Sequence, residues 1–232
     1  MQLELLSQSD LETLSGLIKD ARNIIVCCHK SPDGDAIGSS LAWADYLRQV
    51  GKDPLVIVPD AFPDFLRWLP GVEKVMRYDK HTALCNARMT EADLIFCLDF
   101  NATSRVDDMQ QALDKATAQR VVFDHHLNPQ INARLLVSFP LMSSTCEIVF
   151  RIVWQLGGFD LLTRQAAVAV YCGMMTDTGG FTYNSTRPEI YVIIDHLLTK
   201  GFDKDKVYRK VYNNYSSWAI RFRGYLMSQK LN

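Results

Sequence analysis

Short apolar runs alternate with amphipathic segments over the first 140 residues of the chain. The runs NIIVCC at 23–28 and DLIFCLD at 93–99 are continuously apolar at their centres, which is typical of strands covered on both faces. Apolar residues recur at helical spacing over 34–50, which predicts a helix. By the same criteria we expect further strands at 55–58, 72–77, 120–123 and 133–137, and helices at 82–90 and 103–118.

The rest of the chain has a helical pattern. Ser144-x-x-Glu147 has the spacing of a capping box and predicts a helix that a pair of glycines ends near residue 156. Ser9-x-x-Glu12 has the same spacing and predicts the start of the first helix. Further helices are expected near 163–175, 187–200 and 203–213.

Strands that alternate with helices predict an α/β fold. We expect a mostly parallel sheet flanked by helices on both faces, followed by a helical segment. The composition, 48% hydrophobic and 22% charged, is ordinary for a globular protein and excludes a disordered or fibrous chain. With 232 residues, the chain holds one large domain or one domain and a piece.

The formal net charge of −1 is unevenly distributed along the chain. From Lys200 onward there are eight basic and two acidic residues, with aromatic residues interleaved, and the remaining 199 residues carry −7. The acidic body excludes a broad cationic surface, so we expect no duplex nucleic acid as a partner. We interpret the tail as amphipathic helices whose aromatic side chains pack on the core. A stacking platform for single strands is the alternative.

Several features indicate a soluble cytoplasmic protein with no membrane partner. The longest apolar run, at 166–175, has ten residues, whereas about 18–20 are needed to cross a bilayer. The amino terminus carries acidic residues where a signal peptide would carry basic ones. Six cysteines occur without a C-x-x-C pair, so we expect buried free thiols rather than a zinc ribbon or a redox motif.

The residues that carry chemistry follow the apolar runs. Because the carboxyl ends of parallel strands meet at one edge of a sheet, side chains from four distant segments are expected to line one crevice. A single aspartate at a strand end is usually a turn or helix cap, but four such segments in this order favour a functional site. The residues concerned are His29, Asp33, Asp35, Asp99, Asp124, His125, His126 and Asp177.

Each of the four segments contributes a carboxylate to this crevice. Four carboxylates within a few ångströms would repel one another until some took up protons, and two divalent cations would remove the repulsion. Oxygen ligands with one or two imidazoles suit Mn²⁺ better than Mg²⁺ or structural zinc. We interpret Gly34, between Asp33 and Asp35, as a tight turn that aims the two carboxylates at different ions.

The ordered set of motifs resembles the DHH family of phosphoesterases, named for the triplet that here is Asp124-His125-His126. The resemblance covers nearly the whole chain: HKSPDGDAIGSSLA, LDFNATSR, VVFDHH, the STCE helix start, GMMTDTGGF and NSTRPEIYVIIDHLLTKGFD. Within the family, the sequence is most similar to the group of bifunctional oligoribonucleases and phosphoadenosine phosphate phosphatases, which includes proteins described as exopolyphosphatase-related.

The resemblance implies roles for individual residues. His29, Asp33 and Asp99 would hold one Mn²⁺. Asp35, Asp99, His125 and Asp177 would hold a second, with Mg²⁺ or Co²⁺ as substitutes and Asp99 as the bridge. Asp124 would orient an imidazole, and His126 would face the scissile phosphate or a bridging water. Arg105, within the second motif, is a weaker candidate for a phosphate contact, and a surface role for it is the alternative.

The resemblance also implies the reaction. It is hydrolysis of short oligoribonucleotides or phosphoadenosine phosphate, in which a hydroxide bridging the two ions attacks phosphorus in line. Alternatives within the family are a cyclic-dinucleotide phosphodiesterase, an exopolyphosphatase and a single-strand DNA exonuclease. A non-catalytic nucleotide-binding module stays open as well. The expected partners are short single-stranded RNA or a small phosphorylated nucleotide, and a homodimer is compatible with the sequence.

Family members continue into a second, smaller domain that grips the substrate. We therefore expect residues 1–215 to form the DHH catalytic domain. Residues 216–232 would be an exit helix or linker toward a second domain that this chain lacks.

Overall fold

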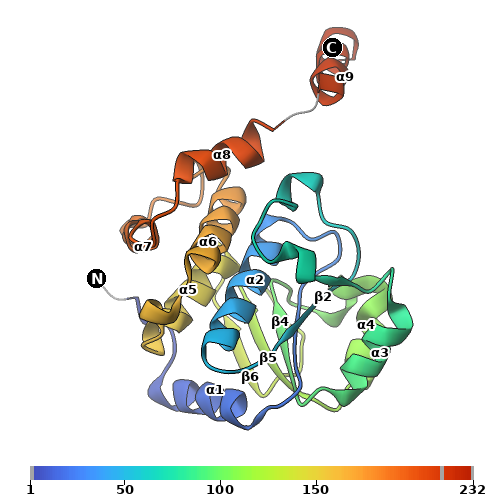
Figure 1. Cartoon of the computed structure of the whole chain (residues 1–232), viewed down its shortest axis with the longest axis vertical. Helices are drawn as coiled ribbons and strands as arrows, with labels where there is room; N and C mark the ends of the chain where they lie inside the picture. The colour runs from blue at the N-terminus through green and yellow to red at the C-terminus, as the bar shows by residue number, and fades with distance from the viewer. Residues whose placement is uncertain (1–2, 215–216, 231–232) are drawn as a thin grey trace.

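The computed structural model describes residues 3–214 and 217–230 and has the predicted α/β architecture (Figure 1). Within these residues, six strands form one parallel sheet in the order β3-β2-β1-β4-β5-β6. The strands are β1 (Ile24–Cys27), β2 (Leu55–Val58), β3 (Met76–Arg77), β4 (Leu94–Leu98), β5 (Gln119–Asp124) and β6 (Leu135–Ser138).

Helices precede, connect and follow the strands, and the carboxyl-terminal half of the chain is helical (Figure 1). The α-helices are α1 (Gln8–Asp20), α2 (Gly34–Gln49), α3 (Thr82–Glu91), α4 (Gln110–Lys115), α5 (Thr145–Gln155), α6 (Arg164–Asp177), α7 (Pro188–Leu198), α8 (Lys204–Tyr212) and α9 (Ser217–Gln229). Short 3₁₀ helices are η1 (Asp64–Leu66), η2 (Val72–Lys74), η3 (Thr103–Met109) and η4 (Phe159–Leu161).

Both faces of the sheet are covered, as the continuously apolar strands predict. Alternate residues of β4 point to opposite sides, so that Phe96 belongs to the core under α2, α5 and α6, and Ile95 to the core under α3 and α4. Trp43 of α2 packs edge-to-face on Phe96 and Phe123, with ring centroids 5.1 and 5.0 Å apart. All six cysteines are buried and free, which confirms their predicted state.

The strand order creates a crevice at one edge of the sheet. β1 lies at the centre, the chain builds outward from it through β2 to β3, and it then returns to β4 on the other side. The connections that leave β1 and β4 therefore diverge at the carboxyl edge, which is where α/β proteins bind ligands. The segments after β1 and β4 carry His29 and Asp99.

Two predicted elements are shorter than the sequence pattern indicates. In place of a continuous helix over 103–118, a 3₁₀ segment (η3) is followed by α4, because Asp107 has a left-handed backbone with φ of 48°. An ion pair with Lys30 accompanies this interruption. The predicted strand at 72–77 is a 3₁₀ turn (η2) followed by the two-residue strand β3.

The first helix begins earlier than its predicted capping box. Ser7, not Ser9, is the N-cap of α1, and its hydroxyl accepts the backbone N–H of Asp10 at 3.2 Å. The second capping position is confirmed, since the hydroxyl of Ser144 accepts the N–H of Glu147 at 3.0 Å. Ser, Thr, Asp and Asn all serve as N-caps, so several neighbouring candidates compete in the sequence alone.

The tail packs on the core only in part. Val207 of α8 is buried, and the hydroxyl of Tyr212 donates to the carbonyl oxygen of Met175 at 3.1 Å. In α9, Trp218 and Phe222 are exposed and stack on each other, with ring centroids 5.1 Å apart. The prediction that the aromatic side chains of the tail pack on the core is therefore wrong for this helix. The predicted domain boundary at 215–216 lies outside the described residues. Over 3–214 and 217–230, no helix is long and apolar enough to cross a membrane.

Glycines bring α2 and α6 unusually close together. A Cβ on Gly38 of α2 would lie 2.5 Å from the backbone oxygen of Ala169 in α6. A Cβ on Gly173 of α6 would lie 3.1 Å from Cα of Asp35 in α2, and 2.2 Å from Sγ of Cys146 in α5. Real Cβ atoms do not approach other atoms this closely, so a larger residue at either position would push the helices apart. This approach brings Asp35 of α2 near Asp177, at the end of α6.

We expect Gly38→Ala to lower the free energy of unfolding by about 1–3 kcal/mol, because the new methyl group meets backbone atoms of α6. Gly16→Ala is the matched control. Gly16 lies inside α1, and no atom lies within 4 Å of the point that its new methyl group would occupy, so this variant should gain about 0.5–1 kcal/mol from helix propensity. Urea unfolding measures the change in free energy for both variants. An unchanged urea midpoint for Gly38→Ala would contradict the close packing of α2 on α6.

Candidate metal centre

Four segments bring their acidic and histidine side chains together at the carboxyl edge of the sheet. One follows β1, one follows β4 directly, one ends β5 and continues into the histidine pair, and one ends helix α6. Asp177 thus arrives from a helix terminus rather than from a strand. Of the nine residues singled out in the sequence, the structure brings together His29, Asp33, Asp35, Asp99, Asp124, His125, His126 and Asp177.

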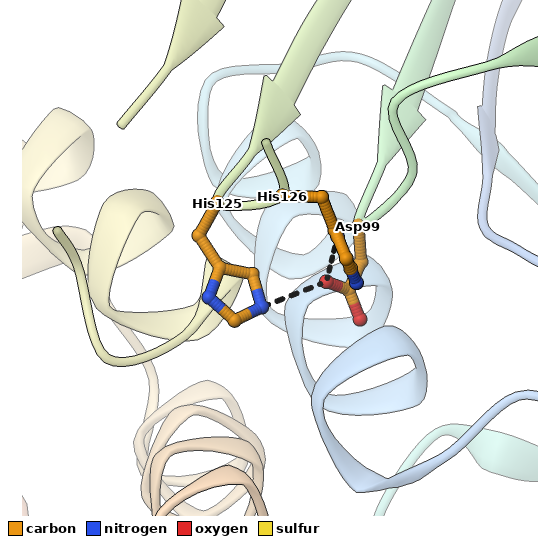
Figure 2. A group of neighbouring side chains, drawn as sticks. All are labelled: Asp99, His125 and His126. Carbon is orange, nitrogen blue, oxygen red and sulfur yellow. Dashed lines mark ion pairs between the residues drawn. The ribbon is translucent and has the colours of Figure 1, made fainter. Parts of the chain in front are cut away.

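Asp99 lies at the middle of the cluster. Its side chain is 2% exposed, and its left-handed backbone, with φ of 66°, turns the chain sharply at the end of β4. Nε2 of His29 lies 3.5 Å from Oδ2 of Asp99, and Nε2 of His125 lies 3.5 Å from Oδ1. Nδ1 of His126 lies 3.8 Å from the same Oδ1 (Figure 2). The two oxygens of Asp99 therefore face different partners.

Three overlapping groups of donor atoms result. Within each group, one ligand atom per residue lies within 4.8 Å of the others. Among the described residues, the groups are His29, Asp33 and Asp99; Asp35, His125 and Asp177; and Asp99, His125 and His126. Asp99 and His125 each belong to two of them, so the donor sets are contiguous.

The distances within these groups resemble those of a coordination sphere more than those of hydrogen bonds. Nε2 of His125 lies 3.3 Å from Oδ2 of Asp177 and 3.9 Å from Oδ2 of Asp35. Strong hydrogen bonds between nitrogen and a carboxylate oxygen are about 2.7–2.9 Å long. Two ligand atoms, each about 2.0–2.2 Å from one cation, lie about 3–4 Å apart. The donor types and spacing therefore fit divalent cations.

The backbone fixes the carboxylate of Asp35 and aims that of Asp33. The N–H groups of Thr145 and Cys146, in the first turn of α5, donate to Asp35 at 2.6 and 2.8 Å. Asp33 is the N-cap of α2: its Oδ1 accepts the N–H groups of Asp35 and Ala36, while its Oδ2 lies 3.9 Å from His29. Two helix N-termini thus hold these carboxylates, which the positive ends of the helix dipoles stabilise.

Thr145 is a residue of the site that the sequence interpretation missed. Its hydroxyl donates to Oδ1 of Asp99 at 2.9 Å. Ser144 and Glu147 stood out as a capping box, and Thr145 lies between them. Its contact with a residue 46 positions away depends on how α5 packs beside β4 and could not be read from spacing.

The second ring nitrogen of each histidine is also occupied. Nδ1 of His29 lies 2.7 Å from the carbonyl oxygen of Lys30, and Nδ1 of His125 lies 3.4 Å from that of Met142. Because a carbonyl oxygen only accepts, each Nδ1 carries the proton and each Nε2 faces the cluster. This tautomer leaves a lone pair on Nε2 for a cation.

Asp124 holds the remaining imidazole. It is fully buried, and its Oδ1 lies 2.7 Å from Nδ1 of His126. Its Oδ2 is buried with no hydrogen-bond partner among the described residues. Among the described residues, His126 is the one member of the cluster within ion-pair distance of Asp124. Asp124 therefore positions His126 and does not add a further metal ligand.

The close carboxylates change one another's acidity. Burial, reinforced by the charge of Asp99, raises the pKa of Asp177 to about 6 and also raises the pKa of Asp35. Burial opposes ionisation of Asp99 as well, but its contacts with His125 and His29 outweigh this and hold its pKa well below the usual range. Burial lowers the pKa of His125, yet Asp99 and its neighbouring carboxylates raise it to about 10. The repulsion predicted from the sequence is therefore present, and a bound cation would displace these protons.

Two sequence interpretations need correction or stay unsupported. Gly34 is the first residue of α2 and makes no tight turn. Glycine is required there because a larger residue would not fit: a Cβ would lie 2.3 Å from Oγ1 of Thr176. Arg105 is exposed. Its carbonyl oxygen accepts the N–H of Lys30, but within the described residues its guanidinium has no hydrogen bond or ion pair to the cluster.

Comparison with known proteins finds relatives that match most of the chain. The family model described as "DHH family, N-terminal domain" matches residues 23–174. The bifunctional oligoribonuclease and PAP phosphatase NrnA of Thermus thermophilus is 30% identical over 234 residues, covering 90% of this chain and 63% of that protein. The cyclic-di-AMP phosphodiesterase PdeA of Listeria monocytogenes is 26% identical, covering 91% of this chain and 33% of that protein.

A solved structure is closely similar. An exopolyphosphatase-related protein from Bacteroides fragilis superimposes with a TM-score of 0.95 at 45% identity, covering 97% of this chain and 67% of that one. The manganese-bound exonuclease RecJ shares the fold alone, with a TM-score of 0.53 at 15% identity. The chain spans about six tenths of the length of two curated relatives that it matches, 59% of one and 63% of the other.

We expect Asp177→Asn to stabilise the metal-free protein by about 1–3 kcal/mol at pH 7. The folded-state pKa of Asp177, about 6, lies above the unfolded value, so the folded protein binds this proton more tightly. That contribution is present at low pH and is lost as the pH rises from about 4 to about 6. Asparagine does not ionise, so the gain should be larger at pH 7 than at pH 5.

Urea unfolding in the presence of a chelator measures this gain, with Asp93→Asn as the control of opposite sign. Asp93 accepts the backbone N–H groups of Asn23 and Arg22, which lower its pKa, so its replacement should destabilise the protein at pH 7. A gain for Asp177→Asn that shrinks between pH 5 and pH 7 would contradict the assigned cause.

Proposed function

Because this chain belongs to the DHH family, we propose that it is a metal-dependent hydrolase of phosphate esters whose substrates are short oligoribonucleotides and phosphoadenosine phosphate. One observation carries the proposal: contiguous histidine and aspartate groups meet on Asp99 at the carboxyl edge of the sheet. The relatives described as oligoribonuclease and PAP phosphatase support the substrate class.

The donor groups suggest how two cations would be held. One would be bound by His29, Asp33 and Asp99, and the second by Asp35, Asp99, His125 and Asp177. Carboxylate oxygens with an imidazole at each ion favour Mn²⁺. Bound cations at such a pair of sites supply Lewis-acid stabilisation of the charge that develops on phosphorus and its oxygens.

The side chains around the cations have separate tasks in this proposal. Asp124 accepts the Nδ1 proton of His126, so Nε2 of the neutral ring has a free lone pair. It could take a proton from water and pass that proton to the leaving oxygen. The ring of His126 packs against that of His125 at 4.8 Å, which keeps it at the mouth of the cluster. Its side chain is 32% exposed, so substrate can reach it.

Charge limits the size of the substrate. Residues 1–199 are net acidic, so a long nucleic acid would be repelled by most of the surface. A mononucleotide or a short oligonucleotide needs favourable contacts only around the cluster. Cyclic dinucleotides are a second candidate class of substrate, because the similarity to PdeA, a cyclic-di-AMP phosphodiesterase, extends over 91% of this chain.

We expect Asp99→Asn to lower kcat/KM for a dinucleotide RNA in Mn²⁺ by roughly a thousandfold, because the shared carboxylate serves both donor groups. Calorimetry should show weaker binding of Mn²⁺ and a lower stoichiometry than in the wild type. Asp114→Asn, on the exposed surface of α4, is the control and should behave as the wild type. Equal turnover by Asp99→Asn would refute the proposal.

A substrate panel separates the candidate reactions. We expect Mn²⁺-dependent release of mononucleotides from dinucleotide RNA, and of phosphate from phosphoadenosine phosphate, at higher kcat/KM than cleavage of cyclic di-AMP or inorganic polyphosphate. Preferential cleavage of cyclic di-AMP would instead assign the chain to the second class. Nucleotide binding without turnover in any arm would favour a non-catalytic module.

A further inference from the structure

A buried cluster of one carboxylate and two guanidinium groups lies beside the metal centre. Glu147 of α5 is fully buried, and its Oε1 accepts from Nε of Arg151 at 2.9 Å. Nη2 of Arg151 lies 2.8 Å from the same oxygen as an ion pair. Its Oε2 accepts from the N–H and hydroxyl of Ser143 at 2.8 and 2.7 Å and from Nη2 of Arg187 at 2.5 Å. Every acceptor position of this carboxylate is therefore well used.

The cluster has one positive charge in excess. One arginine is enough to neutralise Glu147, and Nε and Nη2 of Arg151 lie 2.9 and 2.8 Å from one of its oxygens. Within residues 3–214 and 217–230, Arg187 has no carboxylate other than Glu147 within 4 Å. A salt bridge needs one arginine, and confining a second cation to a partly buried site has a desolvation cost.

Arg187 is linked to the metal centre through Met142. Its Nη1 is 3.5 Å from Sδ of Met142, whose carbonyl oxygen is the partner of Nδ1 of His125. Glu147, its ion-pair partner, lies two positions along α5 from Thr145, which donates to Asp99. One chain of contacts, through Met142 and His125, therefore connects Arg187 to the cluster.

Arg187 also has donors to spare. Its side chain is 30% exposed, and the guanidinium group carries five N–H bonds. Nη2 contacts Glu147 and Nη1 contacts Met142. Nε–H has no hydrogen-bond partner among the described residues. A planar fork with free donors, aligned by a buried carboxylate, is suited to a phosphate group.

We propose that Arg187 binds a second phosphate group of the substrate, adjacent to the one that is hydrolysed. This inference rests on the proposed function and deepens it. The excess positive charge of the cluster offsets the charge of that phosphate, and the buried ion pair with Glu147 holds the guanidinium in place. The preferred substrates are then nucleotides with two phosphate groups, such as a dinucleotide RNA with a 5′-phosphate or a nucleoside bisphosphate.

The matched dinucleotides pApA and ApA, which differ only in the terminal phosphate, test the assignment. We expect Arg187→Gln to lower the ratio of kcat/KM for pApA to that for ApA by about tenfold, mainly through the KM for pApA. Arg187→Lys should recover part of the ratio, because it keeps the charge but not the fork. Arg88→Gln, which removes an exposed arginine paired with Glu91 on α3, is the charge-matched control and should leave the ratio unchanged.

A purely structural role gives a different result. If Arg187 only tethers the segment after Asp177, Arg187→Gln should lower kcat for both dinucleotides equally and weaken Mn²⁺ binding in calorimetry. An unchanged ratio would therefore overturn the assignment, whatever the loss in overall activity.

Equilibrium binding separates this inference from the proposed function. If the wild type bound Mn²⁺ but hydrolysed neither dinucleotide, the proposed function would fail. Calorimetric titration with adenosine 3′,5′-bisphosphate and with adenosine 5′-monophosphate would still test Arg187. We expect the wild type to prefer the bisphosphate and Arg187→Gln to lose about tenfold of that preference. Equal preference in the two proteins would refute the inference.

Discussion

The candidate site depends on one electrostatic constraint, the confinement of several carboxylate groups in a small, mostly buried volume. Asp35 and Asp99 are almost wholly buried, and burial together with the charge of Asp99 raises the pKa of Asp177. Such an arrangement persists only if positive charge or N–H donors compensate for it. The first turn of α5 provides donors to Asp35, and imidazoles provide charge beside Asp99. The same arrangement suits the site to divalent cations.

Close helix packing makes this confinement geometrically feasible. Gly34 and Gly38 on α2, and Gly173 on α6, occupy points where a Cβ would overlap the neighbouring helix or its side chains. Without them, α2 and α6 would lie farther apart, and Asp35 could not share a donor group with Asp177. The stability given up by glycine within a helix, about 1 kcal/mol each, is therefore linked directly to the site.

The negative charge that attracts cations also repels an anionic substrate, so local positive groups must offset it. In our proposals, bound cations do this at the scissile phosphate and Arg187 does it at a neighbouring one. Arg187 is held by a carboxylate that Arg151 already neutralises, so its charge remains available to a ligand. If both proposals hold, this division of tasks would explain how a chain that is acidic over most of its length selects small phosphorylated nucleotides.

The sequence alone determined the α/β class, the main strands and the convergence of the residues that follow strands, because these features depend on local pattern and on the common edge of parallel strands. Asp177 joins them from the end of α6, which strand-end reasoning does not explain. Only the tertiary structure decided the break at Asp107, the role of Gly34 as space rather than a turn, and the contacts of Thr145 and Arg187. Each of these depends on which distant atom lies opposite a residue. That relation is set by how helices pack across the sheet, and spacing along the chain does not encode it.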